Sequence, residues 1–304
     1  MNEIITGDCV HLLKNIEDNF IDAIITDIPY GIGYDDWDVL HNNTNAAYGA
    51  ASKGQIEKGG LYKRRGKPLN GWSEADKDIP KEYELWCKSW AGAFFRVLKP
   101  GASCIIFSGR RFAHRCTYAL EENGFTFKDM IAWEKNTATH RAQHLSSIYE
   151  RRGDDENAEK WKGWKVANMR PLFEPILWFQ KPYKVGGTIA DNVLTYEVGA
   201  WNEDAISKYD HSAAYVVNHS NIIKTKTLES DHGLHSAQKP LLLMQLLIEL
   251  VTIEGALVLD PFCGSGTTCL AAKNTNRNYI GMERDPQIAN IARERIQNQP
   301  MMLF

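Results

Sequence analysis

Two short motifs, far apart in the sequence, carry residue types that could act on a planar nitrogen base. The first, residues 27–30 (DIPY), follows the apolar residues 20–26 and offers an acceptor carboxylate, a proline and an aromatic ring. The second, residues 260–268 (DPFCGSGTT), follows the apolar residues 256–259 and is a glycine-rich loop that leads into a helix. The backbone amides of such a loop can approach a bound ligand closely, in front of a helix N-terminus. Together the motifs predict that a planar base is held in front of a nucleotide-like cofactor.

These motifs must be positioned by the strands that precede them, and the chain alternates strands with helices. Apolar runs predict strands at residues 3–6, 20–26, 103–107, 125–133, 175–179, 256–259 and 279–282. Helical spacing predicts helices from Pro80 to about residue 97, from Thr267, and at residues 111–123, 240–252 and 286–297. The alternation predicts an α/β fold with a parallel sheet and helices on both faces. Ligands bind beyond the carboxyl ends of such strands, where the strand order reverses, so we expect Asp27 and Gly264 to border one pocket.

The bulk composition is that of an ordinary globular protein. The 304 residues, 43% apolar and 24% charged, suffice for one large domain with an insertion or for two smaller ones. The net charge of −3 means that contact with nucleic acid must come from local basic patches. There is no CxxC pair among the six cysteines and no signal-peptide pattern at the N-terminus. No apolar segment is long enough to span a bilayer, so we expect no membrane partner and a cytoplasmic protein, nucleoid-associated if DNA is its substrate.

The region 31–79 has no clear hydrophobic period and carries several glycines. A loop of this length is usually functional or mobile. Its segment 41–70 has six basic residues against Glu57, a local net charge of +5. The residues of this segment that we predict to contact DNA phosphates are Lys63, Arg64, Arg65 and Lys67. A solvated loop without that role is the alternative.

A second group of cations is interleaved with tryptophans and could read or wedge DNA. The DNA-binding residues predicted here are Arg151, Arg152, Lys162 and Lys165. Local packing is the alternative role for the neighbouring Trp161 and Trp164.

Two histidine pairs have the spacing of metal ligands. They are His140 with His144 and His232 with His235. No cysteine or carboxylate completes either set, so we expect no metal.

At the two motifs the chain resembles the β-class of amino-DNA methyltransferases, which methylate adenine N6 or cytosine N4 with S-adenosylmethionine. Residues 27–30 look like the family's catalytic tetrapeptide and residues 260–266 like its cofactor loop. The catalytic motif precedes the cofactor motif, as in this circularly permuted class. Further segments that match in the family's order are residues 98–101, 133–136, 174–178, 235–240 and 279–283. Ile28 departs from the family, which usually has proline there, although Pro29 still biases residue 28 towards an extended conformation.

The resemblance implies a Rossmann-like class I methyltransferase fold, circularly permuted, with a mostly parallel seven-stranded sheet, helices on both faces and inserted DNA-recognition segments. Residues 1–135 would form the catalytic part, including a mobile loop at 31–79. Residues 136–234 would form a target-recognition region that includes one core strand near 175–179. Residues 235–304 would form the part that binds S-adenosylmethionine.

Catalysis in this family would rest on Asp27, Pro29 and Tyr30. The exocyclic amine of the target base is a poor nucleophile, because its lone pair is delocalised into the ring. Asp27 would accept one of its N–H groups and the main-chain carbonyl of residue 28 or 29 the other, which frees the lone pair. Tyr30 would stack on the base after it flips out of the duplex. The plainer alternative is that Asp27 caps a turn and Tyr30 packs in the core.

Cofactor binding would use the glycine loop and a few charged residues. Glu283 suits the two ribose hydroxyls, Asp8 the adenine amine and Lys239 the cofactor carboxylate. The alternatives are a helix N-cap for Asp8 and solvated surface charges for Glu283 and Lys239. The full set predicted to bind S-adenosylmethionine is Asp8, Asp27, Lys239, Asp260, Pro261, Phe262, Gly264, Ser265, Gly266, Thr267 and Glu283.

The function that we predict is methyl transfer from S-adenosylmethionine to adenine N6 in duplex DNA. Asp27 favours adenine, because cytosine-N4 members of the class more often carry serine at that position. Cytosine-N4 methylation is the alternative. RNA or a protein amide as substrate, and a DNA-binding subunit without catalysis, are the other hypotheses. Double-stranded DNA is the expected partner, and a homodimer and a cognate restriction endonuclease are compatible with the class.

Overall fold

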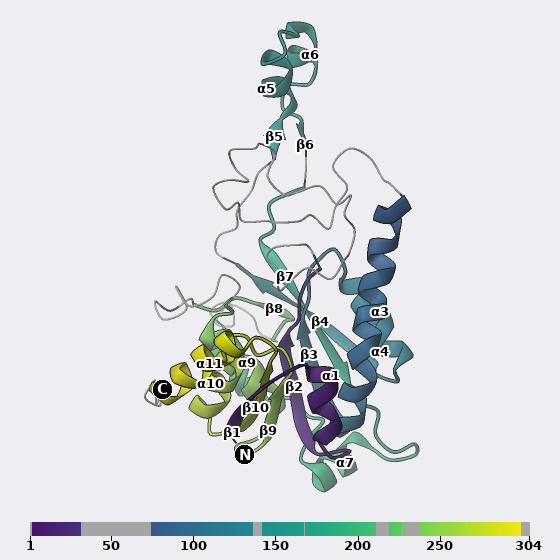
Figure 1. The fold of residues 1–304 in the computed structure, drawn as a ribbon, viewed down its shortest axis with the longest axis vertical. Helices are drawn as coiled ribbons and strands as arrows, with labels where there is room; N and C mark the ends of the chain where they lie inside the picture. Colours follow the sequence, from purple (N-terminus) through teal and green to yellow (C-terminus); the bar gives the residue numbers. More distant parts are fainter. Residues whose placement is uncertain are drawn as a thin grey trace.

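The centre of the molecule is an eight-stranded sheet with the order β1-β10-β9-β2-β3-β7-β4-β8 (Figure 1). The computed structural model describes residues 2–31, 74–135, 142–166, 168–210, 219–226, 228 and 238–298. The strands are β1 (Asn2–Thr6), β2 (Ile21–Asp27), β3 (Leu98–Phe107), β4 (Thr126–Glu134), β7 (Phe173–Gln180), β8 (Ile222–Ile223), β9 (Leu257–Asp260) and β10 (Asn278–Glu283). Neighbouring strands are parallel except where β7 pairs with β3 and β4. The predicted mostly parallel α/β fold is confirmed.

The predicted number of seven strands is wrong by one. All seven predicted strands are present, and β8 adds an eighth at the edge of the sheet, beside β4. This strand contains only two residues, too few to produce a hydrophobic period that a sequence could reveal.

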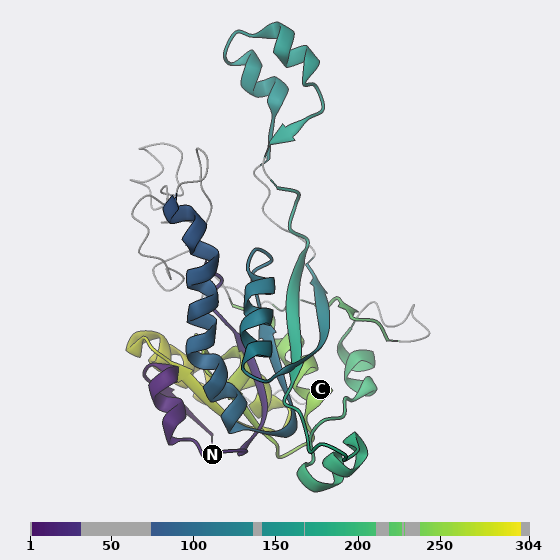
Figure 2. The ribbon, with the colours of Figure 1, turned by 90° about the vertical axis from the view of Figure 1, so that its right-hand side faces the viewer.

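Helices cover both faces of the sheet (Figures 1 and 2). On one face lie α1 (Cys9–Leu12), the short 3-10 helix η1 (Leu13–Asn15), α3 (Glu74–Val97) and α4 (Ala113–Glu122). On the other face lie α8 (Glu203–Tyr209), α9 (Leu241–Val251), α10 (Thr267–Asn274) and α11 (Pro286–Asn298). Alternate residues of β2 serve the two layers: Ile24 packs in the first cluster and Ile25 in the second.

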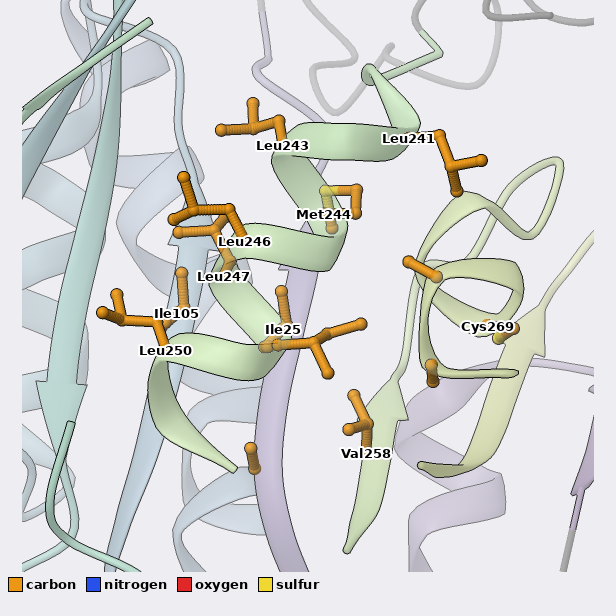
Figure 3. Packing of buried hydrophobic residues seen from close by; sticks show 14 of the residues in the cluster. Ile25, Ile105, Leu241, Leu243, Met244, Leu246, Leu247, Leu250, Val258 and Cys269 are labelled. Carbon is orange, nitrogen blue, oxygen red and sulfur yellow. The ribbon is translucent and has the colours of Figure 1, made fainter. Parts of the chain in front are cut away.

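Burial on both sides explains why the central strands read as unbroken apolar runs. Residues 21–26 of β2 are all buried, and α9 lies over them. Figure 3 shows Leu247 and Leu250 of α9 beside Ile25 and Ile105 of the central strands, with Val258 of β9 below.

None of the described helices is long and apolar enough to cross a membrane. All six cysteines are buried and free.

The strand order reverses at β2, where the candidate site begins. The chain continues from β2 to β3 on one side, whereas β9 lies on the other side of β2. The register pairs Ala23 with Val258 and Ile24 with Leu259, so both strands end at the same edge. The loops after β2 and β9 therefore meet, as the sequence predicts.

Helix α3 begins earlier than the sequence suggests. It starts at Glu74, and Pro80 lies inside it rather than in its first turn. Six helical residues precede Pro80, so its missing N–H and its ring, which meets the carbonyl four residues earlier, weaken the first turns of the helix at some energetic cost. Residues 74–79 of the predicted loop 31–79 are thus helical, and residues 32–73 lie outside the described part of the chain.

A small helical hairpin stands away from the sheet, beyond the adjacent ends of β4 and β7 (Figures 1 and 2). It consists of β5 (Gln143–His144), α5 (Leu145–Glu150), α6 (Asp155–Lys160) and β6 (Lys165–Val166), with β5 antiparallel to β6. After β7, α7 (Ile189–Tyr196) packs near β3, and α8 packs on α9. The region 136–234 therefore combines this hairpin with elements that belong to the main body.

Candidate active site

Asp27, the last residue of β2, lies at the carboxyl edge of the sheet beside Lys239 and the Tyr30 hydroxyl, both of which oppose the rise of its pKa on burial. Its Oδ2 accepts a hydrogen bond from Nζ of Lys239 at 2.5 Å, and the lysine side chain is only 8% exposed. Its Oδ1 is buried and has no hydrogen-bond partner within the described residues. Because buried polar atoms are normally paired, this oxygen is the natural acceptor for a ligand.

Lys239 is a buried charge, so its predicted alternative as a solvated surface residue is wrong. Burial raises the pKa of Asp27, and the Lys239 ammonium opposes that shift. Burial alone would lower the pKa of Lys239, but the charges of Asp27 and Glu174 raise it above its ordinary value. The ammonium also lies 5.2 Å from the ring centroid of Tyr30 and 5.3 Å from that of Phe107, within cation–π range.

Tyr30 is half-buried and anchored by its hydroxyl. The hydroxyl donates a hydrogen bond to Oε1 of Glu174 at 3.0 Å. Burial raises the pKa of Tyr30 well above its ordinary value, and the charges of Asp27 and Glu174 add to this, so the hydroxyl keeps its proton. Gly109 permits this position, because a Cβ at residue 109 would lie 2.9 Å from Cβ of Tyr30.

The main-chain carbonyl of Pro29 is also held in place. It accepts a hydrogen bond from the hydroxyl of Tyr83, in α3, at 3.1 Å. A carbonyl oxygen has two lone pairs, so it can still accept a second N–H. Ile28, where the family usually has proline, is 1% exposed and packs in the core beside α3.

The glycine loop after β9 is shaped by two residues with positive φ. Gly264 has φ +50° and Gly266 has φ +79°, and Gly266 is the N-cap of α10. A Cβ at residue 264 would meet no atom within 4 Å, whereas a Cβ at residue 266 would lie 3.0 Å from Cβ of Ala292. Gly264 therefore borders open space, and Gly266 allows α11 to approach.

Glu283, at the end of β10, is hydrogen-bonded to the backbone of this loop. Its Oε2 accepts a hydrogen bond from the backbone N–H of Gly264 at 3.0 Å, and its Oε1 accepts one from Asp285 at 2.8 Å. Burial raises the pKa of Glu283 above its ordinary value, and these backbone donors oppose the shift. Each carboxylate oxygen retains a lone pair that could accept a ribose hydroxyl.

Asp260 joins the two loops and is 3% exposed. Its Oδ1 accepts hydrogen bonds from Thr26 Oγ1 at 2.6 Å and from the backbone N–H of Phe262 at 3.1 Å. Its Oδ2 accepts from Thr268 Oγ1 at 2.5 Å. Burial raises its pKa to about 6, although the two threonine hydroxyls oppose the shift. Both oxygens of Asp260 accept hydrogen bonds from the protein, so its role in the site is structural: it links the loops after β2 and β9.

One pocket lies between the loops and brings most of the predicted cofactor residues together. Those that line it are Asp8, Asp27, Lys239, Asp260, Pro261, Phe262, Gly264, Ser265, Thr267 and Glu283. Gly266 faces Ala292 and Ile296 of α11 instead. Asp8 accepts a hydrogen bond from the backbone N–H of Val10 at 2.8 Å, so it is the N-cap of α1, its predicted alternative role, as well as a pocket residue. The roles assigned to these residues stay predictions.

Two tryptophans that the sequence did not single out form an aromatic wall of the pocket. Trp86 and Trp90 of α3 line it, and their ring centroids lie 5.7 Å and 6.0 Å from that of Phe262. Their spacing of four residues is that of one face of a helix, which does not distinguish a pocket wall from the core, and Trp90 belongs to both. Glu174 and Tyr83, which hydrogen-bond to Tyr30 and to the Pro29 carbonyl, were missed for the same reason: each lies in or beside a segment that reads as core.

The described cations predicted to bind DNA are all exposed on the helical hairpin. Arg151 donates to the carbonyl of Ser147, and Lys162 pairs with Glu159 at 3.3 Å. Residues 142–166 contain five basic and five acidic side chains, so the hairpin as a whole is not a basic patch. Trp164 is 61% exposed and meets Trp161 edge-on at 5.5 Å. Arg152 and Lys165 complete the predicted set on this surface.

Several predicted residues lie outside the described part of the chain. They are Lys63, Arg64, Arg65, Lys67, His140, His232 and His235. Among the residues that the structure does describe, no three His, Cys, Asp or Glu side chains are grouped as a metal site.

Fold and site together define a methyltransferase-like arrangement, and comparison with known proteins identifies the family. The family model N6_N4_Mtase, DNA methylase, matches residues 21–294. The type II methyltransferase M.HindIII of Haemophilus influenzae is 58% identical over 293 residues, 96% of this chain and 94% of that protein. M.HinfI, also a type II methyltransferase of Haemophilus influenzae, is 25% identical over 302 residues, 97% of this chain and 68% of that protein. The chain therefore belongs to the N6/N4 DNA methylase family.

Solved structures share the fold. The PvuII DNA methyltransferase, cytosine-N4-specific, superposes with a TM-score of 0.60 at 16% identity, covering 99% of this chain and 87% of that one. The M1.HpyAVI–SAM complex gives a TM-score of 0.54 at 23% identity, covering 98% of this chain and all of that one. At these identities the likeness supports the class I fold.

The two loop glycines should respond differently to substitution by alanine. In Gly264→Ala the added methyl group meets open space, so we expect a stability loss of about 1 kcal/mol from the positive φ but at least a tenfold loss of S-adenosylmethionine affinity. In Gly266→Ala the contact with Ala292 adds overpacking, so we expect a stability loss of about 2–3 kcal/mol. Urea unfolding and calorimetric titration measure the two effects. Wild-type cofactor affinity in Gly264→Ala would show that this loop does not face the cofactor.

The carboxyl of Asp260 should make folding stability depend on pH. Its pKa of about 6 in the folded protein lies above the ordinary 3.8, so the folded state binds more protons between these values. Stability therefore falls as pH rises through this window, by roughly 3 kcal/mol. Asp260→Asn cannot titrate at this position, so its free energy of unfolding should rise relative to that of wild type as pH rises. Urea unfolding from about pH 4 to about pH 7 measures both. A constant difference between the two proteins would contradict the raised pKa.

Proposed function

We propose that this DNA methylase transfers a methyl group from S-adenosylmethionine to N6 of an adenine flipped out of duplex DNA. The observation that carries the proposal is the buried Oδ1 of Asp27, an acceptor without a partner among the described residues, in the same pocket as the glycine loop. An acceptor for an amine and a loop for a cofactor thus share one cavity.

The residues of the pocket fit S-adenosylmethionine. Gly264 borders open space that a side chain would fill, Glu283 offers acceptors for ribose hydroxyls, and Phe262 with Trp86 offers aromatic surface for adenine. Nζ of Lys239 has three donors and can meet a carboxylate in addition to Asp27. When bound, S-adenosylmethionine supplies an electrophilic methyl group on a sulfonium, so the reaction needs no metal.

Asp27 and Pro29 act on the nucleophile. Asp27 Oδ1 accepts one N–H of the target amine and the Pro29 carbonyl, held by Tyr83, accepts the other. Both contacts draw the amine lone pair out of the ring and towards the pocket, and they stabilise the positive charge that develops on nitrogen. Burial raises the pKa of Asp27, and the charge of Lys239 and its hydrogen bond oppose that rise, which favours the carboxylate form as the acceptor.

Duplex DNA is the proposed partner, which the match to the DNA methylase family supports; because a stacked base cannot reach this pocket, the target base must flip out of the duplex. Tyr30 offers a ring for the extruded base beside Asp27. The cations of the helical hairpin and of residues 63–67 are proposed to contact the DNA backbone, and the exposed Trp164 to contact the bases. The 58% identical relative is named a type II methyltransferase, which supports a restriction–modification role beside a cognate endonuclease at the nucleoid.

Adenine is preferred over cytosine because residue 27 is aspartate rather than the serine usual in cytosine-N4 members. Cytosine N4 is the alternative, since the same acceptors suit its exocyclic amine. Nucleoside mass analysis of DNA from a methylation-deficient host that expresses the chain should detect N6-methyladenine. Detection of N4-methylcytosine without methyladenine would reject the adenine assignment.

Replacement of Asp27 should separate catalysis from cofactor binding. Asp27→Asn keeps the size of the side chain and loses its charge, so we expect kcat to fall about 100-fold or more while S-adenosylmethionine affinity changes little. Methyl transfer with radiolabelled cofactor and calorimetric titration measure the two properties. Glu134→Gln, which neutralises an exposed carboxylate on β4, is the matched control and should retain activity. Full activity of Asp27→Asn would refute the role of the carboxylate.

A further inference from the structure

Glu174 reaches the catalytic corner from a strand that runs against the others. It is the second residue of β7 and pairs with Trp133 of β4 in the sheet register. Because β7 is antiparallel to β3, its first residues lie beside the carboxyl ends of the parallel strands. Its side chain is 14% exposed and faces three groups of the site: Tyr30, Lys135 and Lys239.

The Glu174 carboxylate makes a directional contact with Tyr30. Oε1 accepts the Tyr30 hydroxyl at 3.0 Å, and Oε2 lies 3.5 Å from Nζ of Lys135. Burial alone would raise the pKa of Glu174, but the charges of Lys239 and Lys135 and the hydrogen bond from Tyr30 hold it below its ordinary value. The carboxylate is therefore ionised, and the tyrosine donates to a charged acceptor, which is the stronger kind of hydrogen bond.

Two other contacts leave the tyrosine ring little freedom. Gly109 lies against its Cβ, and Nζ of Lys239 lies 5.2 Å from its ring centroid. The ring is thus fixed at its base by the backbone of the β3–α4 connection and at its tip by Glu174. A ring held in this way offers a target base a stacking surface whose orientation is set before the base arrives.

We propose that Glu174 is a positioning residue for the target base, which it serves by holding Tyr30 through the tyrosine hydroxyl. This inference rests on the proposed function, in which Tyr30 stacks on the flipped base. The contact with Lys135 ties the same carboxylate to the end of β4, from which the chain continues to the helical hairpin. Glu174 therefore contacts both Tyr30, on which the target base is proposed to stack, and Lys135, which precedes the helical hairpin proposed to contact DNA.

A purely electrostatic role for Glu174 makes a different prediction. Asp27 and Glu174 are balanced by Lys239 and Lys135, so removing one carboxylate leaves an excess positive charge. If that balance were its role, Glu174→Gln would be as harmful as Glu174→Ala. If the hydrogen bond is its role, Glu174→Gln should retain most function, because the amide oxygen still accepts the tyrosine hydroxyl.

The decisive experiment is a double-mutant cycle between Glu174→Ala and Tyr30→Phe. The readouts are kcat, KM for DNA, and the fluorescence of 2-aminopurine placed at the target position, which reports the flipped base. A hydrogen bond to a charged acceptor corresponds to about a tenfold to hundredfold change, so each single variant should lose the flipping signal and kcat/KM by about that factor. The double variant should be no worse than either single one, and S-adenosylmethionine affinity should stay within about threefold.

Independent, multiplicative losses in the double variant would overturn the inference, as would equal losses in Glu174→Gln and Glu174→Ala. Glu134→Ala, which removes a neighbouring exposed carboxylate on β4, is the matched control and should behave as wild type. If Glu174→Ala fails to fold by urea unfolding, Tyr30→Phe, which removes only the hydroxyl, still tests the same hydrogen bond, and wild-type kcat/KM and flipping signal in that variant would overturn the inference. Absence of adenine methylation by wild type would defeat the proposed function separately, because that measurement does not involve Glu174.

Discussion

The hydrogen bonds accepted by Asp260 are the interaction on which the site depends. Thr26, near the end of β2, donates to one of its oxygens, and Thr268, in the first turn of α10, donates to the other. Strand pairing between β2 and β9 covers only residues 23–24 against 258–259 and stops short of the loops. The buried carboxylate continues the connection past the last paired residues. It thereby fixes Asp27 and the glycine loop relative to each other.

Much of this architecture could be predicted from sequence because the central strands are buried on both faces. Such strands read as unbroken apolar runs, and β2 and β9 each end in a motif of unusual chemistry. The strand-order rule then placed both loops at one edge without any structural information. The short strand β8 and the early start of α3 were not predictable in this way. A two-residue strand has no period, and Pro80 suggested a helix start that the structure places six residues earlier.

The parts of the site that sequence could not reveal come from segments that read as core. Trp86 and Trp90 recur at helical spacing, and nothing in that spacing tells a pocket wall from a core face. Glu174 lies near the start of β7, whereas the rule for parallel sheets directs attention to strand ends. Only the reversal of β7 brings the start of that strand to the functional edge. Strand direction is a property of the assembled sheet, which no local pattern encodes.

The charges around Asp27 bear on how a buried carboxylate can serve as an acceptor. An isolated Asp27 in this pocket would bind a proton and lose one of its acceptor positions. Lys239 opposes the rise in the pKa of Asp27 on burial and occupies Oδ2, which leaves Oδ1 as the carboxylate oxygen without a hydrogen-bond partner among the described residues. The lysine cannot withdraw to meet a cofactor carboxylate without raising the pKa of Asp27 further. Since an ammonium has three donors, Lys239 can keep its hydrogen bond to Asp27 and still donate to a second carboxylate, as the proposed cofactor contact requires.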